Sequence, residues 1–219
     1  MPALHVLRVF VNEDGECGNR LGVFLHGEQV RERDRQDVAT GLGFSETVFV
    51  EDGGALRIHT PSVELPFAGH PLVGTAWLLA KEGECVAALH PPAGEVTVDY
   101  SDDTTRIAAL AAWAPPFEFV QLDSPAEVRA LRPATHGTNS YAWSWIDEAA
   151  GTIRARSFVR EAGIAEDEAT GSAALALCSR LDRPVTIHQG RGSVILCEPL
   201  ADGRAEVGGR VVLDEVRDY

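Results

Sequence analysis

Residues 67–81 have the sequence Phe67-Ala-Gly-His-Pro-Leu-Val-Gly-Thr-Ala-Trp-Leu-Leu-Ala-Lys81. Proline suits the first helical position because its missing N–H would have no helical partner, and the residues after Pro71 are nearly all apolar or small as far as Ala80. Gly83 follows just past the end. The pattern predicts a helix over about 71–81. Since this helix is apolar on every side, we expect other elements to surround it.

The start of this helix also predicts a binding site. The backbone N–H groups near Gly69 and His70 would lack helical acceptors and would carry the positive end of the helix dipole. In a protected space they would suit an anionic ligand. A neutral His70 imidazole could contact a substrate hydroxyl or amine there, and the alternative role for His70 is simple helix capping.

A second stretch of the same kind occupies residues 166–181, Glu166-Asp-Glu-Ala-Thr-Gly-Ser-Ala-Ala-Leu-Ala-Leu-Cys-Ser-Arg-Leu181. Thr170 or Ser172 could cap an apolar helix over about 171–181, and Asp182-Arg-Pro184 would end it. Two enclosed helices indicate two lobes related as a diverged internal repeat. We therefore expect the two helix starts, residues 69–71 and 169–172, to face each other across one cleft.

Strand patterns surround both predicted helices. We predict an α+β protein of two similar lobes, each a rolled, mostly antiparallel, barrel-like sheet around one central helix. The paired prolines Pro115-Pro116 favour a stiff connector, which divides the chain into 1–114 and 115–219. The predicted strands cover 4–11, 21–26, 45–50, 55–60, 63–66, 86–90, 95–100, 106–113, 117–122, 141–146, 153–159, 185–188, 193–197 and 206–213, with surface helices over 32–40 and 125–131.

Composition restricts the class of protein. The chain has 219 residues, a formal net charge of -14 and 45% hydrophobic residues, which suits a soluble protein and disfavours a nucleic-acid or anionic-membrane surface. No apolar run approaches the roughly 20 residues of a membrane span, and no signal peptide is evident, so we expect a cytoplasmic protein. The four cysteines are widely separated and the histidines lack ligand spacing, so neither disulfides nor a metal site are predicted.

The two helix starts resemble the two signatures of the PhzF family of phenazine biosynthesis, whose fold is related to that of diaminopimelate epimerase. Further similarity lies at residues 18–23, 45–49, 156–158 and 207–211, so the resemblance covers nearly the whole chain. Two departures stand out. Glu168 occupies a position where the family usually has proline, and it could shift nearby pKa values. Residues 189–193 look like a contracted form of a longer family segment.

The resemblance implies a cofactor-independent isomerase with Glu46 as its general acid/base. Moving a proton between carbons needs a group that takes and returns it, and apolar neighbours such as Val48 and Phe49 would raise the pKa of Glu46 suitably. The alternative is a solvated glutamate at a strand edge. The resemblance also implies residues that hold a small anionic substrate, without metal or cofactor: Gly69, His70, Asp167, Gly171 and Ser172. For Asp167 and Ser172 the alternative is ordinary helix capping.

The substrate class implied by the resemblance is a cyclic carboxylated compound of the dihydro-hydroxyanthranilate type. Two alternatives stay open: an amino-acid or hydroxy-acid epimerase that uses carboxylate bases, and a catalytically silent homologue that binds a small acid. Cys17 precedes Gly18-Asn19, as in thiol-based racemases, but it lies before a strand rather than at a helix start. The resemblance and several tryptophans in a short second lobe predict a homodimer.

Overall fold

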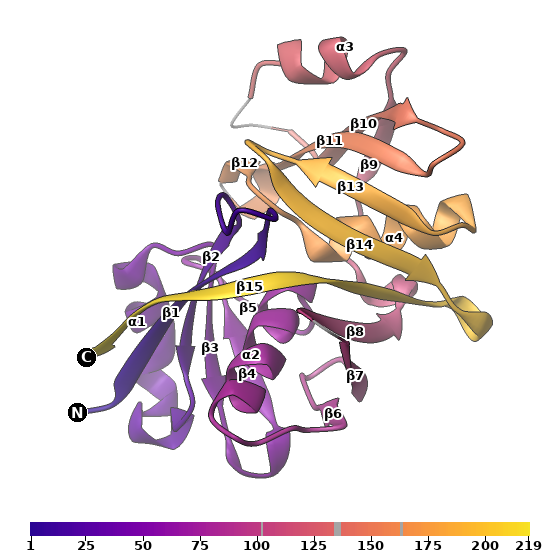
Figure 1. The fold of residues 1–219 in the computed structure, drawn as a ribbon. Coiled ribbons are helices and arrows are strands. Elements are labelled where there is room, and N and C mark those ends of the chain that lie inside the picture. The colour runs from indigo at the N-terminus through magenta and orange to yellow at the C-terminus, as the bar shows by residue number, and fades with distance from the viewer. Residues whose placement is uncertain (102, 134–136, 163) are drawn as a thin grey trace.

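The computed structural model describes residues 1–101, 103–133, 137–162 and 164–219. Within them, the strands join into one mixed sheet in the order β5-β4-β3-β2-β1-β15-β14-β13-β11-β10-β9, with β12, β8, β7 and β6 attached at its sides (Figure 1). The strands of the first half are β1 (Ala3–Val11), β2 (Asn19–Phe24), β3 (Glu46–Val50), β4 (Leu56–His59), β5 (Glu64–Leu65), β6 (Ala88–Leu89), β7 (Val96–Ser101) and β8 (Thr104–Leu110). Those of the second half are β9 (Glu118–Gln121), β10 (Ser140–Asp147), β11 (Thr152–Val159), β12 (Ile164–Asp167), β13 (Val185–Gln189), β14 (Ser193–Pro199) and β15 (Arg204–Asp218).

The C-terminal strand β15 joins the two halves of the molecule. Its residues 210–218 pair antiparallel with β1, while residues 204–209 pair antiparallel with β8 and residues 205–208 pair with β14. Most other pairs are also antiparallel, the exceptions being β2 with β3, β9 with β10 and β11 with β13. The sheet around each central helix therefore depends on one shared strand.

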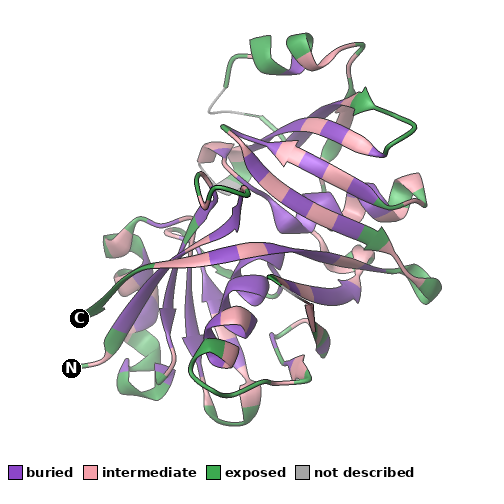
Figure 2. Cartoon of the chain, viewed as in Figure 1, coloured by how far each residue is buried: buried purple, intermediate pink, exposed green. Residues whose placement is uncertain are grey.

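Two of the four α-helices in the described residues lie inside the sheet. The helices are α1 (Arg35–Leu42), α2 (Gly69–Lys81), α3 (Pro125–Ala130) and α4 (Gly171–Leu181). Helix α2 packs against β1, β2, β3, β8 and β15, and α4 packs against β14 and β15. Both helices are mostly buried (Figure 2), and one continuous apolar core contains residues from each of them. The predicted architecture, a mixed α+β sheet rolled around two apolar helices, is confirmed.

The helix boundaries differ from the predicted ones at two starts. Helix α2 begins at Gly69, so Pro71 is its third residue rather than its first. Any first-turn position tolerates proline, because none of these N–H groups has a helical acceptor. Thr170 is the N-cap of α4, but its hydroxyl donates to Asp167 and makes no capping bond. Ser124 does cap α3, through a hydrogen bond from the Glu127 N–H.

The strand predictions were wrong at three places. The predicted strand 106–113 ends at Leu110, where a 3-10 turn over Ala111–Trp113 leads to the two prolines. Strand β12 was not predicted, because its four residues lead into an acidic segment and show little alternation of apolar and polar side chains. Strand β15 extends to Asp218, since the exposed residues at its end still pair with β1. The predicted helix 32–40 begins as a 3-10 turn and becomes α1 at Arg35.

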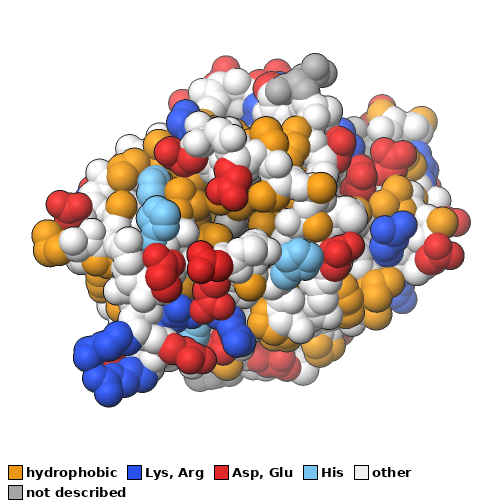
Figure 3. All heavy atoms as spheres, turned by 90° about the horizontal axis from the view of Figure 1, so that it is seen from below, with side chains coloured by type: hydrophobic (Ala, Val, Ile, Leu, Met, Phe, Trp, Pro, Cys, Tyr) orange, Lys and Arg blue, Asp and Glu red, His pale blue; other side chains and the backbone are white. Residues whose placement is uncertain are grey.

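Part of the predicted organisation stays a prediction. Nothing in the fold decides whether 1–114 and 115–219 are separate units, and the cytoplasmic location is likewise open. Among the described residues, no helix combines the length and the apolar character needed to cross a membrane. Acidic side chains are spread over the face shown in Figure 3, in keeping with the net charge of -14.

The starts of α2 and α4 touch each other through two glycines. A β-carbon placed on Gly69 would lie 2.8 Å from the carbonyl carbon of Gly171, and one placed on Gly171 would lie 2.8 Å from the His70 nitrogen. Both obstacles are backbone atoms, which cannot rotate away as a side chain can. The predicted meeting of the two helix starts is therefore present, and it requires glycine on both sides.

We expect Gly69→Ala to lower the free energy of unfolding by about 1–3 kcal/mol, because the added methyl must push two helix backbones apart. Urea denaturation of both proteins measures the difference. Gly41→Ala is the matched control, since Gly41 is helical and its nearest obstacle is the Tyr219 hydroxyl at 3.8 Å. That control should be unchanged or more stable by up to about 1 kcal/mol. Equal stability of Gly69→Ala and wild type would contradict the contact.

Candidate active site

Glu46 is the first residue of β3 and lies beside Leu21 in the parallel pair of β2 and β3. Only 12% of its side chain is exposed, and that side chain lines a cavity of about 190 Å³. Near the cavity the chain brings together strand ends, the starts of α2 and α4, and the connector between the halves. The cavity is lined by Glu46, Thr60, Val63, Leu65, Phe67, Ala68, Pro115, Phe117, Asn139, Val159, Glu161, Ile164, Thr170 and Ser172.

His70 lies directly behind Glu46. Its Nε2 is 3.2 Å from Oε2 of Glu46, and the His70 side chain is 3% exposed. The two atoms lack the angle of a regular hydrogen bond, and within the described part of the chain neither has another hydrogen-bonding partner. Buried polar atoms are nearly always satisfied, so an unpaired carboxylate oxygen at a cavity wall is typical of a functional group awaiting a ligand.

Burial sets the protonation state of this pair. Burial raises the pKa of Glu46 well above its usual range, and the nearby charge of Asp167 raises it further. Burial lowers the pKa of His70 to about 3, although a hydrogen bond with the Arg20 backbone opposes that shift. His70 is therefore neutral at physiological pH. Glu46 keeps its proton to a higher pH than an exposed glutamate does.

Asp167 lies at the end of β12 in a very different environment. Its Oδ1 accepts a hydrogen bond of 2.7 Å from the Asn19 side-chain amide, and its Oδ2 accepts one of 2.6 Å from the Thr170 hydroxyl. Burial raises the pKa of Asp167 to about 6, against the opposing effect of these hydrogen bonds. Both carboxylate oxygens of Asp167 are thus occupied by the protein, whereas Glu46 has an oxygen left over.

A buried polar network extends behind Asp167. Gln189 donates to the Asp167 carbonyl at 3.0 Å and to the Thr170 hydroxyl at 3.1 Å, and it accepts from the Tyr141 hydroxyl at 2.8 Å. Gln189 and Tyr141 have no exposed surface. Because each member satisfies the next, the network fixes the position of Asp167 at the start of α4.

The structure brings the predicted site residues together but places them in two layers. Glu46 and Ser172 line the cavity directly. The other four, all buried, lie behind its wall: Gly69, His70, Asp167 and Gly171. No observation here tests their predicted roles in substrate binding, so those roles stay predictions.

Two polar residues near the site were missed as individual candidates. Asn19 is 3% exposed and bridges Asp167 to the Ala169 carbonyl at the start of α4. The Ser45 hydroxyl donates to Oδ1 of Asn19 at 2.9 Å. Both residues fall inside segments that resemble the PhzF family, residues 18–23 and 45–49. That was the only signal for them, because Asn19 contacts residues more than a hundred positions away in sequence and Ser45 is linked to them through Asn19.

The cavity wall is largely apolar and lacks positive side chains. Its described lining includes Phe67, Phe117 and Ile164 and contains no Lys or Arg. An anionic substrate group would therefore have to be bound by backbone N–H groups at the starts of α2 and α4, which reach the wall at Ala68 and Ser172. The arrangement favours a small, mostly apolar molecule with one anionic group.

Glu168 does not point into this cavity, although it follows Asp167 directly. Its carboxylate accepts hydrogen bonds from the Arg191 backbone at 2.9 Å and from the Ser193 hydroxyl at 3.0 Å. Its charge nevertheless raises the pKa of Asp167. The expectation that Glu168 would shift a nearby pKa is consistent with this geometry.

Comparisons with known proteins agree with the arrangement. A family model described as phenazine biosynthesis-like protein matches residues 8–145. The chain is 31% identical to a trans-2,3-dihydro-3-hydroxyanthranilate isomerase of Pseudomonas aeruginosa, over 87% of this chain and 84% of the relative.

Solved structures share the fold. A PhzF-family protein of Enterococcus faecalis covers 100% of this chain with 99% of its own, at a TM-score of 0.81 and 21% identity. A hydroxyproline epimerase from Agrobacterium vitis covers 99% of this chain with 91% of its own, at a TM-score of 0.63 and 11% identity. Since the family model spans more than half of the chain and the isomerase relative most of it, the chain belongs to the phenazine biosynthesis-like PhzF family of isomerases.

Proposed function

We propose that this protein catalyses a cofactor-independent isomerisation in which Glu46 moves a proton within a small cyclic carboxylated substrate. One observation carries the proposal: Oε2 of Glu46 is buried beside the cavity and has no hydrogen-bonding partner among the described residues, whereas both oxygens of Asp167 accept hydrogen bonds. A general base needs a free oxygen within reach of the substrate. Glu46 meets that requirement and Asp167 does not.

The chemistry needs no group beyond the chain and the substrate. In the first step the Glu46 carboxylate takes a proton from a substrate carbon, and the electron pair of the broken C–H bond moves into the π system. In the second step Glu46, whose carboxyl proton can exchange with water, returns a proton to a different carbon, and the electron pair moves to form the shifted double bond. A neutral His70 next to Glu46 would keep the carboxyl group oriented without adding a charge.

The cavity supports a substrate of limited size and polarity. Its volume of about 190 Å³ suits a single substituted ring, and its apolar residues Phe67, Phe117 and Ile164 could pack against the ring faces. The relative from Pseudomonas aeruginosa is named for trans-2,3-dihydro-3-hydroxyanthranilate, a ring of this kind with one carboxylate. We propose a compound of this class as the substrate, with its carboxylate bound at the N-terminus of α4.

The main alternative is an epimerase that removes and returns a proton at one carbon. The hydroxyproline epimerase has a similar fold, which makes this alternative reasonable, but at 11% identity the similarity concerns the fold alone. Neither helix start here carries a cysteine, and Cys17 lies in a loop beside Gly192. A catalytically silent small-acid binder is the other alternative, and the exchange experiment below separates all three.

We also propose that the protein forms a homodimer. Trp143 is already buried within one copy of the chain, but Ile146 on the same strand is 50% exposed. Light scattering should return a mass of about twice 23.5 kDa at micromolar concentration. A mass of one chain under those conditions would contradict the dimer.

We expect Glu46→Gln to lower turnover roughly a hundredfold to ten-thousandfold, because glutamine keeps the size of the side chain but cannot accept a proton. Substrate affinity should be largely retained. The measurement is conversion of trans-2,3-dihydro-3-hydroxyanthranilate in deuterated water, with deuterium on the substrate and product carbons followed by NMR. Glu118→Gln, an exposed glutamate on β9, is the control and should retain wild-type turnover.

Each outcome of this experiment has a separate meaning. Exchange with double-bond migration supports the isomerase. Exchange at one carbon with inversion and no migration supports the epimerase. Tight binding by wild type without any exchange would favour the silent binder, and exchange that survives in Glu46→Gln would identify another base, with Asp167 the first to test.

Glu46→Gln should also change how stability depends on pH. The unfolded Glu46 loses its proton above about pH 4.3, whereas the folded group, whose pKa is raised, keeps it, so wild type loses stability as the pH rises. Glutamine removes this loss. Relative to its value near pH 4, the stability difference should move in favour of the variant as the pH rises toward the pKa of the folded Glu46, by up to about 1.4 kcal/mol per pH unit. Urea denaturation at each pH measures this. A pH-independent difference would show that Glu46 is not buried as an acid.

A further inference from the structure

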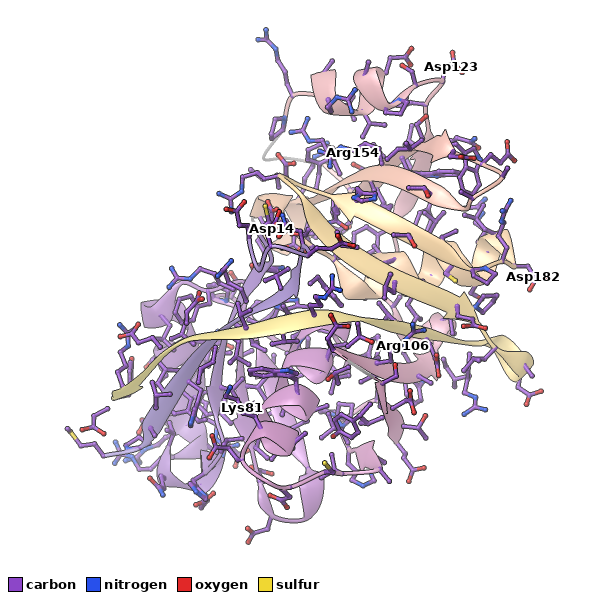
Figure 4. The ribbon with its side chains drawn as sticks, viewed as in Figure 1. Asp14, Lys81, Arg106, Asp123, Arg154 and Asp182 are labelled. Carbon is purple, nitrogen blue, oxygen red and sulfur yellow. The ribbon has the colours of Figure 1, made fainter. Side chains whose placement is uncertain are left out.

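Four arginines gather around a second cavity, on the other side of β12 from Asp167. This arginine cavity has a volume of about 550 Å³, within the range of small-molecule sites. Figure 4 labels Arg154, which lies beneath α3 in that view. The cavity is lined by Arg129, Leu131, Arg154, Arg156, Glu166, Glu168, Gly190 and Arg191.

Two of the four arginines are neutralised by carboxylates. Arg156 forms a bidentate pair with Glu166, at 2.7 Å from Nε and 2.6 Å from Nη2. Arg191 lies 3.2 Å from Glu168, with its side chain 80% exposed. Each of the two acids in the lining is therefore paired with one arginine. The remaining positive charges belong to Arg129 and Arg154.

Arg154 is held in place by backbone carbonyls and forms no ion pair with any described residue, although Glu166 and Glu168 lie near enough to oppose the lowering of its pKa. Its Nη1 donates to the His188 carbonyl at 3.1 Å and its Nη2 donates to the Gly190 carbonyl. Its Nε is buried and has no hydrogen-bonding partner within the described part of the chain. Carbonyl groups satisfy donors but do not neutralise a guanidinium, so the charge of Arg154 remains at the cavity wall.

Arg129 adds a second charge to the lining. It lies at the exposed end of α3, whose backbone carbonyl at Arg129 accepts a hydrogen bond of 3.1 Å from Arg156. After burial, the charges of Arg129 and Arg156 are what lower the pKa of Arg154. That repulsion shows that the positive charges lie close together, although the whole chain carries a net charge of -14. Such a local excess of positive charge attracts anions.

We propose that the arginine cavity binds a small dianion, of the phosphate or dicarboxylate class. Four charges from Arg129, Arg154, Arg156 and Arg191 set against two from Glu166 and Glu168 leave an excess of two, which a dianion would neutralise. Guanidinium groups match the oxygens of both phosphate and carboxylate. This ligand would be distinct from the substrate, because β12 separates the arginine cavity from Glu46.

The experiment is calorimetric titration of the full chain, without substrate, with inorganic phosphate in one arm and succinate in the other. Binding of either dianion is expected, and the stronger arm identifies the class of ligand. Acetate, a monoanion, should bind at least tenfold more weakly. Arg129→Gln should weaken the binding about tenfold, because it removes one unpaired charge from an exposed position where folding is not at risk.

Two further variants keep the test decisive. Arg154→Gln should also weaken binding, provided that its thermal unfolding shows a folded protein. Arg204→Gln is the matched control, since it removes an exposed arginine beyond the other end of β14 and should leave the affinity unchanged.

The location of binding is tested by NMR. The backbone amide signals of Gly190 and Arg191 should shift on titration, while those of Gly171 and Ser172 should not. The proposal is overturned if neither dianion binds up to about 10 mM. It is equally overturned if Arg129→Gln binds as wild type does, or if only the α4 signals shift. None of these results bears on the role of Glu46.

Discussion

The contact between Gly69 and Gly171 is the constraint on which the site depends. It lets two helix starts from distant parts of the chain approach until a β-carbon on either glycine would clash with backbone. His70 follows one of these glycines and Asp167 precedes the other by four residues, so the contact also brings an imidazole and a carboxylate into the region of Glu46. Two positive helix ends at one place then favour an anionic group between them.

The two buried carboxyl groups near this contact, those of Asp167 and Glu46, differ in their hydrogen-bond donors. Asn19 and Thr170 donate hydrogen bonds to the two carboxylate oxygens of Asp167, and these bonds anchor the start of α4. Oε2 of Glu46 accepts no hydrogen bond from any described residue. Burying an unpaired carboxyl group costs stability, because the folded state must retain a proton that water would remove. The same burial raises the pKa of Glu46 well above its usual range.

The sequence was most informative where the hydrophobic pattern and the residues at the ends of a segment predicted the same element. The two central helices could be predicted because their apolar character, their small residues and their ends all agree. The short β12 and the length of β15 could not, because they are set by pairing with distant strands rather than by local alternation. Glu46 and Asp167 were candidates through resemblance alone. Their different environments depend on Asn19 and Thr170, and no local pattern indicates which acid such residues will contact.

The two departures from the family pattern turn out to contact each other. Glu168, at the position where proline is usual, accepts hydrogen bonds from the contracted turn at Arg191 and Ser193. Gly190 in that turn has a φ of +58°, and a β-carbon there would lie 2.5 Å from the Glu168 carbonyl oxygen. Side chains alternate along an extended segment, so Asp167 faces Asn19 and Thr170 while Glu166 and Glu168 line the arginine cavity. The acid at position 168 and the turn at 190–193 are therefore joined by hydrogen bonds, next to the residue that anchors the start of α4.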